Sequence, residues 1–319
     1  MTELYDVIII GGGPGGLTAG LYARRAALRT AMVEKGLHGG QVNFTEGVEN
    51  YPGFESISGF DLSNRFLQHA KSYGLELVQQ EVTAVEPDTE CHKVLLANGE
   101  ILQTHAVILA TGGSPCKLNV LGEMEYYGRG VSYCATCDGF FYQDKTVVVV
   151  GGGNTALEEA LYLAKLTKRV YLVHRRNAFR GSRILQERVI SEPKIDILWS
   201  TIATSIIGSS NGVCGIYLKD TETGELRDLA TDAVFIFIGF LPNNQLVPKS
   251  IKMDADGYVI TDDKCETTIP GVFVVGDLRQ KYAKQIITAS ADGCIAALAA
   301  AHFVEMKKAK KTVKYLHNY

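Results

Sequence analysis

The chain has 319 residues, of which 46% are hydrophobic and 21% charged, as in an ordinary globular protein. This length is about twice that of a typical domain, so we expect two domains or one domain interrupted by an insertion. A net charge of -3 gives no overall positive field for a nucleic-acid backbone, which argues against nucleic acid as a partner.

The apolar segments do not indicate a membrane span or an export signal. The longest apolar run, 294–304, is shorter than the roughly 18 residues that a spanning helix needs. The start of the chain lacks the basic end and long apolar middle of a secretory signal, so we expect a cytoplasmic protein that does not bind membranes. Seven cysteines without an export signal favour reduced or redox-active thiols over a structural disulfide framework.

Two segments of the chain share one pattern. The first reads VIIIGGGPGGLTAG from Val7, and the second reads VVVVGGGNTALEEA from Val147. Each β-branched run predicts a buried parallel strand, and the residues after the glycines have the apolar spacing of a helix. An internal repeat of this kind predicts two similar α/β domains.

The glycines in both segments have the spacing of dinucleotide-binding loops, G-x-G-x-x-G and G-x-G-x-x-A. Small residues are needed there because the backbone turns tightly and approaches a pyrophosphate at the amino end of the helix. An ordinary tight turn is the alternative, although two copies in the same context argue against it. The predicted cofactor-binding residues are Gly11, Gly13, Pro14 and Gly16 in the first copy and Gly151, Gly153, Asn154, Thr155 and Ala156 in the second.

The end of the second predicted strand distinguishes the two copies. Glu34 in the first copy can accept hydrogen bonds from both ribose hydroxyls of FAD or NAD and would repel a 2′-phosphate. The second copy has His174, Arg175 and Arg176 there, with Arg180 further on, and guanidinium groups match phosphate oxygens. This copy is predicted to prefer NADPH, unless the arginines are only a solvated basic edge.

Three further strands are predicted to end at the nucleotide sites. Ala106–Leu109 leads to Thr111 and Gly112, and Ala233–Phe237 leads to Ile238 and Gly239. Near the carboxyl end, a strand stops at Gly276 and Asp277, where the aspartate either faces the ligand crevice or caps the next helix. The basic tail over 307–311 is interpreted as a solvated helix end, with an interaction tail as the alternative.

Cys134 and Cys137 form a Cys-x-x-Cys motif just before the second glycine loop. A zinc site is disfavoured because there is no second such pair, and two inert buried thiols are a further alternative. The interpretation we prefer is a reversible disulfide, which beside a flavin would pass electrons from NADPH to an external disulfide. Asp138 is a candidate proton donor to the leaving thiolate, or it only shapes the turn.

At this point the sequence resembles the bacterial low-molecular-weight thioredoxin reductases over essentially the whole chain. The resemblance is carried by Gly39-Gly40-Gln41, by residues 48–53 (VENYPG) and 134–142 (CATCDGFFY), by 151–160, by His174-Arg175-Arg176 and by Gly276-Asp277. It implies that FAD is held by the first glycine loop and by Glu34, Lys35, Gly40, Gln41, Asn50, Val82, Thr111, Gly112, Asp277, Lys284, Gln285 and Ile286.

The resemblance also implies roles for the redox pair and an oligomeric state. Cys137 would lie against the isoalloxazine ring of FAD, and Cys134 would attack the protein substrate. A homodimer and a large rotation of the inserted domain are implied as well. The chain departs from the family at Ala283-Lys284-Gln285, where Tyr-Arg-Gln is common, which puts a guanidinium contact near the flavin in doubt.

Together these features predict an α/β protein with two dinucleotide-binding, Rossmann-like domains of three-layer ββα type, the NADPH domain being inserted into the FAD domain. The predicted boundaries are 1–116 and 244–319 for the FAD domain and 117–243 for the NADPH domain. The predicted activity is reduction of thioredoxin by NADPH through FAD and the cysteine pair. A dithiol oxidase of the same fold, a related reductase with another donor or acceptor, and a non-catalytic redox sensor are the alternatives.

Overall fold

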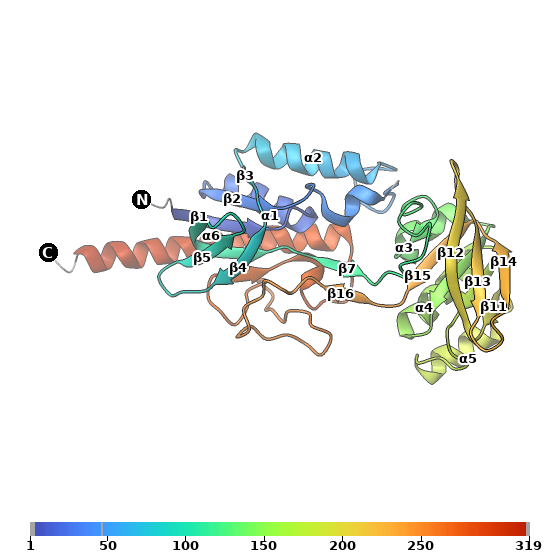
Figure 1. Ribbon diagram of the computed structural model, residues 1–319. Coiled ribbons are helices and arrows are strands. Elements are labelled where there is room, and N and C mark those ends of the chain that lie inside the picture. The colour runs from blue at the N-terminus through green and yellow to red at the C-terminus, as the bar shows by residue number, and fades with distance from the viewer. Residues whose placement is uncertain (1–3, 46, 317–319) are drawn as a thin grey trace. The chain divides into compact units, whose positions relative to one another are not determined.

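The computed structural model describes residues 4–45 and 47–316. Contacts within the chain divide it into two units (Figure 1). The first unit comprises 1–43, 57–114 and 241–319, and the second comprises 44–56 and 115–240. The second unit therefore interrupts the first in sequence. It also includes the short segment 44–56, which the predicted domain over 117–243 did not contain.

The first unit is built on a seven-stranded sheet in the order β3-β2-β1-β6-β5-β4, with β17 pairing with β6. The strands β1, β2, β3, β6 and β17 run parallel, and β4 and β5 are antiparallel additions at one edge. The bounds are β1 Leu4–Ile10, β2 Thr30–Glu34, β3 Glu76–Gln79, β4 Val82–Glu86, β5 His92–Leu96, β6 Ile101–Leu109 and β17 Val272–Val274.

Strand β1 contributes to an apolar core on each face of this sheet. Val7 and Ile9 point into the core that the helices cover, whereas Ile8 and Ile10 point into the core on the opposite face. A strand buried on both faces must be apolar at every position, which is the pattern that predicted a buried parallel strand. That prediction is confirmed.

Three long helices and two short 3-10 helices complete the first unit. They are α1 Pro14–Arg25, η1 Gly40–Phe44, α2 Gly59–Ser72, η3 Gly276–Leu278 and α6 Ile286–Leu316. The last residue of η1, Phe44, belongs to the second unit. Helices α1 and α6 approach so closely that a Cβ on Gly293 would lie 2.2 Å from the Gly15 carbonyl oxygen. Ser58 caps the start of helix α2, because its hydroxyl group accepts a hydrogen bond from the Asp61 amide.

Helix α6 has a segment, Ile286–Lys310, that is long and apolar enough by length and composition to cross a membrane. Asp292 interrupts the apolar run, so a count of uninterrupted apolar residues did not indicate this segment, whereas the mean hydropathy over 18 residues is high. Ala296, Ala297, Ala300 and Val304 of this helix are buried in the core against the sheet. This packing accounts for one face of the helix, and 39% of the apolar window is buried within the chain.

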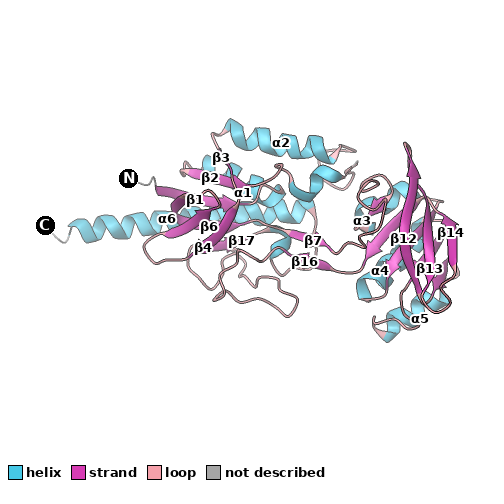
Figure 2. Cartoon of the chain, viewed as in Figure 1, coloured by secondary structure: helices cyan, strands magenta, loops and turns pink. Residues whose placement is uncertain are grey.

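The second unit repeats the arrangement with a parallel five-stranded sheet in the order β11-β10-β9-β15-β8. A three-stranded antiparallel sheet, β12-β13-β14, accompanies it (Figure 2). The strand bounds are β8 Val131–Ser132, β9 Thr146–Gly151, β10 Arg169–Val173, β11 Ile195–Leu198, β12 Thr201–Ser209, β13 Gly212–Asp220, β14 Leu226–Ala230 and β15 Ala233–Phe237.

The parallel sheet of the second unit lies between helices and the three-stranded sheet. Val147 and Val149 of β9 pack in the core with helix α4, and Val148 and Val150 pack in the core with β13. The helices are α3 Ala135–Asp138, η2 Gly139–Tyr142, α4 Asn154–Leu166 and α5 Arg183–Ser191. The three layers match the predicted ββα type, and the predicted fold class is confirmed.

Two short strands lie where the chain passes from one unit to the other, at 114–115 and 240–241. They are β7 Gly113–Pro115 and β16 Phe240–Pro242, which pair with each other.

Candidate functional site

The first glycine loop, between β1 and α1, has the backbone geometry of a nucleotide-binding turn. Gly11 has a φ of +107°, and a Cβ there would lie 2.4 Å from the Ala110 carbonyl oxygen. A Cβ on Gly16 would lie 2.0 Å from the Gly11 carbonyl oxygen. A Cβ on Gly13, in contrast, would have no atom within 4 Å. Gly13 is also the N-cap of α1 and no side chain caps it, so the first amides of the helix can bind a phosphate.

Glu34, at the end of β2, stabilises this loop directly. Its Oε2 accepts a hydrogen bond of 2.7 Å from the Gly12 amide, and its Oε1 accepts one of 2.7 Å from the Gly36 amide. Each carboxylate oxygen has a second lone pair that can accept from a ribose hydroxyl. The neighbouring Lys35 instead forms an exposed ion pair with Glu81, at 3.0 Å.

Most of the other predicted FAD residues lie at different places in the first unit. Thr111 and Gly112 are fixed by Asn243, whose side-chain amide donates to the Thr111 carbonyl oxygen at 2.8 Å. Val82 is buried in β4, Gly40 and Gln41 begin η1, and Gln285 and Ile286 lie at the start of α6. The ammonium group of Lys284 lies 4.1 Å from the centre of the Tyr258 ring. Asn50 is exposed and belongs by its contacts to the second unit.

Asp277, the predicted crevice aspartate, lies in η3, and burial raises the pKa of its carboxyl group. Its Oδ1 is buried without a hydrogen-bond partner among the described residues, and the Lys281 ammonium group lies 3.8 Å away. A buried acceptor in this position is suited to a ligand hydroxyl or amide donor. The neighbouring positive charge opposes the effect of burial on the pKa.

A buried cluster of charges that the sequence analysis missed fixes the turn containing Asp277. Asp292 of α6 accepts hydrogen bonds from Arg279 at 2.6 Å and from Lys281 and the Gly276 amide at 3.1 Å each. The Asp292 side chain is 8% exposed, so these partners supply the compensation that a buried carboxylate needs. The one feature of the sequence that could have indicated this cluster was Asp292, a single charged residue within an Ala-rich helical segment.

The second glycine loop, between β9 and α4, repeats the geometry of the first. A Cβ on Gly151 would lie 2.5 Å from the Phe237 carbonyl oxygen, and nothing lies within 4 Å of one on Gly153. Gly153 is the N-cap of α4, again without a side-chain cap, and Ala156 is buried in the first turns of the helix. Asn154 accepts a hydrogen bond of 2.7 Å from the Ser182 amide, which ties the loop 177–182 to this site.

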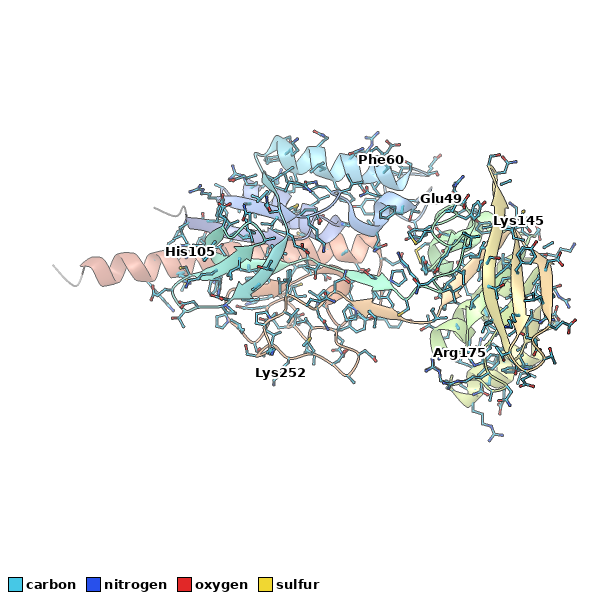
Figure 3. All side chains as sticks on the ribbon, in the orientation of Figure 1. Glu49, Phe60, His105, Lys145, Arg175 and Lys252 are labelled. Carbon is cyan, nitrogen blue, oxygen red and sulfur yellow. A yellow bond between two sulfur atoms is a disulfide. The ribbon has the colours of Figure 1, made fainter. Side chains whose placement is uncertain are left out.

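His174 and the three arginines have different environments. His174 is buried, its ring lies where a Cβ on Gly152 would be, and its Nε2 is 3.0 Å from the Ala178 carbonyl oxygen. Burial lowers the pKa of His174, which favours the neutral ring at physiological pH. The cations available at the surface are therefore Arg175 (Figure 3), Arg176 and Arg180. The Arg180 amide donates to the Gly152 carbonyl oxygen at 2.8 Å.

Ile238 and Gly239 follow β15. Ile238 is 37% exposed, and a Cβ on Gly239 would lie 3.1 Å from the Cys116 sulfur. The Gly239 carbonyl oxygen also accepts a hydrogen bond of 2.9 Å from the Cys116 amide. These contacts leave little room for a larger residue at position 239.

Cys134 and Cys137 are joined by a disulfide bond, with their Cα atoms 5.3 Å apart. Both residues are partly exposed, so the interpretation as inert buried thiols does not hold. Cys134 is the N-cap of α3, and its Sγ lies 3.4 Å from the Thr136 hydroxyl group. A partly exposed disulfide between close cysteines can be reached by an attacking thiolate.

Asp138 follows the disulfide directly and is partly buried. Burial raises the pKa of its carboxyl group to about 6, so it can hold or release a proton near neutral pH. A cavity of about 270 Å³ lies beside it, lined by Ser132, Asp138, Phe141 and Tyr142 and by three glycines, Gly47, Gly128 and Gly130, with Val131. The Phe44 ring stacks on Tyr127 with centroids 5.9 Å apart, which helps to place segment 44–56 in this unit.

Comparisons with known proteins agree with these features. Residues 5–293 match the family described as pyridine nucleotide-disulphide oxidoreductase. The thioredoxin reductase of Bacillus subtilis (strain 168) is 45% identical, over 98% of this chain and 99% of the relative. That of Treponema pallidum (strain Nichols) is 43% identical, over 94% of this chain and 97% of the relative.

A solved structure gives the same result. The crystal structure of thioredoxin reductase from Streptococcus pyogenes MGAS5005 matches with a TM-score of 0.93 and 41% identity, over 96% of this chain and 100% of that chain. The resemblance found from the sequence motifs is thus confirmed. The chain belongs to the pyridine nucleotide-disulphide oxidoreductase family, in the group that includes these thioredoxin reductases.

Proposed function

We propose that this protein is a thioredoxin-disulfide reductase that uses NADPH, FAD and the Cys134–Cys137 disulfide. The observation that carries the proposal is that disulfide. It is partly exposed and is followed directly by Asp138, a partly buried acid whose pKa is raised to about 6. Four relatives that are 42–45% identical to this chain are each named thioredoxin reductase, which supports the same activity.

The first unit fits FAD. Gly13 leaves the approach to α1 open, Glu34 has free lone pairs for ribose hydroxyls, and Asp277 has a buried oxygen without a hydrogen-bond partner among the described residues. These features support binding of the pyrophosphate by the loop, of the adenosine ribose by Glu34 and of a flavin-side hydroxyl by Asp277. FAD supplies the step that the chain lacks, transfer of an electron pair from a nicotinamide to a disulfide.

The second unit fits NADPH. Gly153 is open at the N-terminus of α4, and the exposed Arg175, Arg176 and Arg180 offer guanidinium groups for a 2′-phosphate. The buried His174 would support the loop rather than contact the phosphate as a cation. Accordingly, we propose that the second unit, which contains 117–240 of the predicted NADPH domain, binds NADPH and that the first unit binds FAD.

The cysteine pair would act by thiol–disulfide exchange. In the reduced enzyme, the Cys134 thiolate attacks one sulfur of the thioredoxin disulfide, so that a mixed disulfide forms and the other thioredoxin sulfur leaves as a thiolate. Asp138 gives its proton to that leaving sulfur. Cys137 then attacks Cys134, which restores the enzyme disulfide and releases the second thioredoxin sulfur. Two electrons have passed to thioredoxin and one disulfide has been exchanged for another.

The remaining properties proposed are a cytoplasmic location, a homodimer and no association with membranes or nucleic acid. The α/β fold and the net charge of -3 support a soluble enzyme without a nucleic-acid partner. The exposed Ile295 and Leu298 on α6 support burial of part of this helix against a second copy.

The deciding experiment changes Cys134 and Cys137 separately to Ser, with Cys214→Ser, an exposed cysteine of the same unit, as the control. Anaerobic bleaching of the flavin by NADPH should persist in both variants, while reduction of thioredoxin disulfide is lost and the control keeps both activities. Thioredoxin turnover that survives in either variant would refute the proposal. Electrons that pass only to oxygen in the parent enzyme would indicate a dithiol oxidase instead.

A further inference from the structure

We propose that Asn154 is a specificity-determining positioning residue, which fixes loop 177–182 (the arginine loop) on the second glycine loop and so holds Arg180 for the 2′-phosphate of NADPH. The proposal rests on the proposed function, because it concerns which nucleotide the second unit selects. The sequence motif predicted Asn154 as a residue of the cofactor loop, but it requires only small residues at fixed positions and assigns no task to the side chain at position 154.

Three consecutive amides of the arginine loop bind the second glycine loop. The Arg180 amide donates to the Gly152 carbonyl oxygen at 2.8 Å, and the Gly181 amide donates to the same oxygen at 3.2 Å. The next amide, that of Ser182, donates to Asn154 Oδ1 at 2.7 Å. Two of these contacts use a backbone acceptor that any residue supplies, whereas the third depends on one side chain.

The residue after Arg180 packs closely against helix α4. A Cβ on Gly181 would lie 2.6 Å from Leu157 Cδ1 and 3.3 Å from Asn154 Oδ1. Gln186 of α5 donates from its Nε2 to the Gly181 carbonyl oxygen at 2.7 Å. Asn154 therefore lies at the contact where α4 meets the arginine loop, with its acceptor oxygen toward the loop backbone.

The arginine loop is also anchored on the other side of Arg180. The Phe179 side chain is 7% exposed, and its ring packs against Trp199 with centroids 4.3 Å apart. The Ala178 carbonyl oxygen lies 3.0 Å from His174 Nε2. Arg180 is thus an exposed residue between two anchored neighbours, so its backbone is held while its guanidinium group stays accessible to a ligand.

The first unit has the backbone contact without the side-chain contact. The Gly39 amide donates to the Gly12 carbonyl oxygen at 2.7 Å, and Gly12 is the equivalent of Gly152. Pro14 stands at the position equivalent to Asn154, and its side chain has no acceptor atom. The hydrogen bond from Asn154 is therefore particular to the unit that we propose binds NADPH.

Loss of the Asn154 side chain would leave the Ser182 amide without this acceptor and the arginine loop less firmly fixed. A ligand that uses Arg180 would then have to order the loop on binding, which lowers its affinity. A nucleotide without a 2′-phosphate makes no such use of Arg180, so its affinity does not depend on the order of the loop. Asn154 therefore acts on the difference between the two nucleotides.

The test measures the calorimetric binding of adenosine 2′,5′-bisphosphate and of adenosine 5′-monophosphate to the oxidised holoenzyme. Asn154→Ala should weaken the bisphosphate about fivefold and leave the monophosphate nearly unchanged. In an enzyme that already carries Arg180→Ala, the same change should have no further effect on the bisphosphate, because the two residues act as one unit. Asn211→Ala, in the exposed turn between β12 and β13, is the control.

Asn154→Asp keeps an acceptor for the Ser182 amide, so it should restore the ratio of the two affinities even though its charge weakens both ligands. A partly unfolded variant lowers the number of binding sites and not the ratio, so the calorimetric stoichiometry identifies it. Equal weakening of both ligands by Asn154→Ala, or unchanged binding of the bisphosphate, would overturn the proposal.

The parent enzyme separates this proposal from the proposed function. If the parent binds both ligands equally well, the preference for NADPH is contradicted, and the role of Asn154 is contradicted with it. If the parent prefers the bisphosphate and Asn154→Ala keeps the same preference, only the role of Asn154 is refuted. Thioredoxin turnover does not enter either measurement.

Discussion

The Glu34 carboxylate accepts a hydrogen bond from the Gly12 amide, at 2.7 Å, so the end of β2 and the glycine loop are held together by the side chain that we propose also binds the cofactor. In the second unit His174 stands at the equivalent position, and its ring occupies the space beside Gly152. The two loops therefore have similar backbone conformations, but a different side chain packs against each loop. This difference determines which charges each loop presents to its nucleotide.

Changing Glu34 to Gln should weaken FAD binding about tenfold or more and lower the melting temperature. Glutamine has one carbonyl oxygen, so it can accept from the buried Gly12 N–H or from the exposed Gly36 N–H but not from both, and its amide group cannot accept a hydrogen bond from a ribose hydroxyl. The flavin-to-protein ratio after dialysis and a thermal melt measure the effect, with Glu86→Gln at the exposed end of β4 as the control. Retention of FAD at the parent level would contradict the assigned role of Glu34.

Replacing both Arg175 and Arg176 by Ala should raise the apparent KM for NADPH about 10–100-fold and that for NADH by far less. Each guanidinium group that binds the 2′-phosphate contributes a charge-assisted hydrogen bond that NADH cannot use. Steady-state kinetics with both donors check this, and Arg183→Ala, whose side chain forms an exposed ion pair with Glu187, is the control. Equal increases for the two donors would show that the arginines are only a solvated edge.

Gly16→Ala should destabilise the first unit by about 1–3 kcal/mol, whether or not FAD is present. Its Cβ would lie 2.0 Å from the Gly11 carbonyl oxygen, which is backbone and cannot move without opening the turn. Gly13→Ala is the matched control, because nothing lies within 4 Å of its Cβ. That variant should keep the stability of the apoprotein and lose FAD affinity, so denaturant unfolding and flavin binding separate the two effects.

Acid should destabilise the first unit through His92. Burial, with Lys307 nearby, lowers the pKa of His92 to about 4 from 6.5. Between these values the unfolded chain binds a proton that the folded chain does not, so stability falls as pH falls from about 6.5 to about 4, by on the order of 2 kcal/mol. His92→Gln should flatten this dependence in urea unfolding at a series of pH values. An identical slope in the variant would contradict the assignment.

Asp138 should act in the opposite direction in the second unit. Its pKa is raised from 3.8 to about 6, so the folded state binds its proton more tightly, and this contribution to stability is lost as pH rises through about 6. Asp138→Asn should remove that dependence. Unfolding monitored by Trp199, the one tryptophan of the chain, is a probe that lies in the second unit.

Much of the candidate site could be predicted because its requirements are local. The glycine loops need small residues at fixed spacing after a buried strand, and two residues between cysteines bring their sulfurs within bonding distance. These features depend on a few consecutive residues, so the sequence contains them in full. The same repeat showed that Glu34 and His174 occupy equivalent positions, each at the end of the second strand of its copy.

What the sequence alone determined was therefore the repeat, the two dinucleotide loops, the cysteine pair and the family. Only the tertiary structure decided that His174 is buried and that Lys284 lies against Tyr258. It also decided that segment 44–56 packs with the second unit. The hydrogen bonds that Asp292 accepts from Arg279, Lys281 and the Gly276 amide likewise depend on the tertiary structure. The physical reason is that burial and ion pairing depend on which surfaces meet after folding. No local pattern of residue types records which distant side chain will fill a given space.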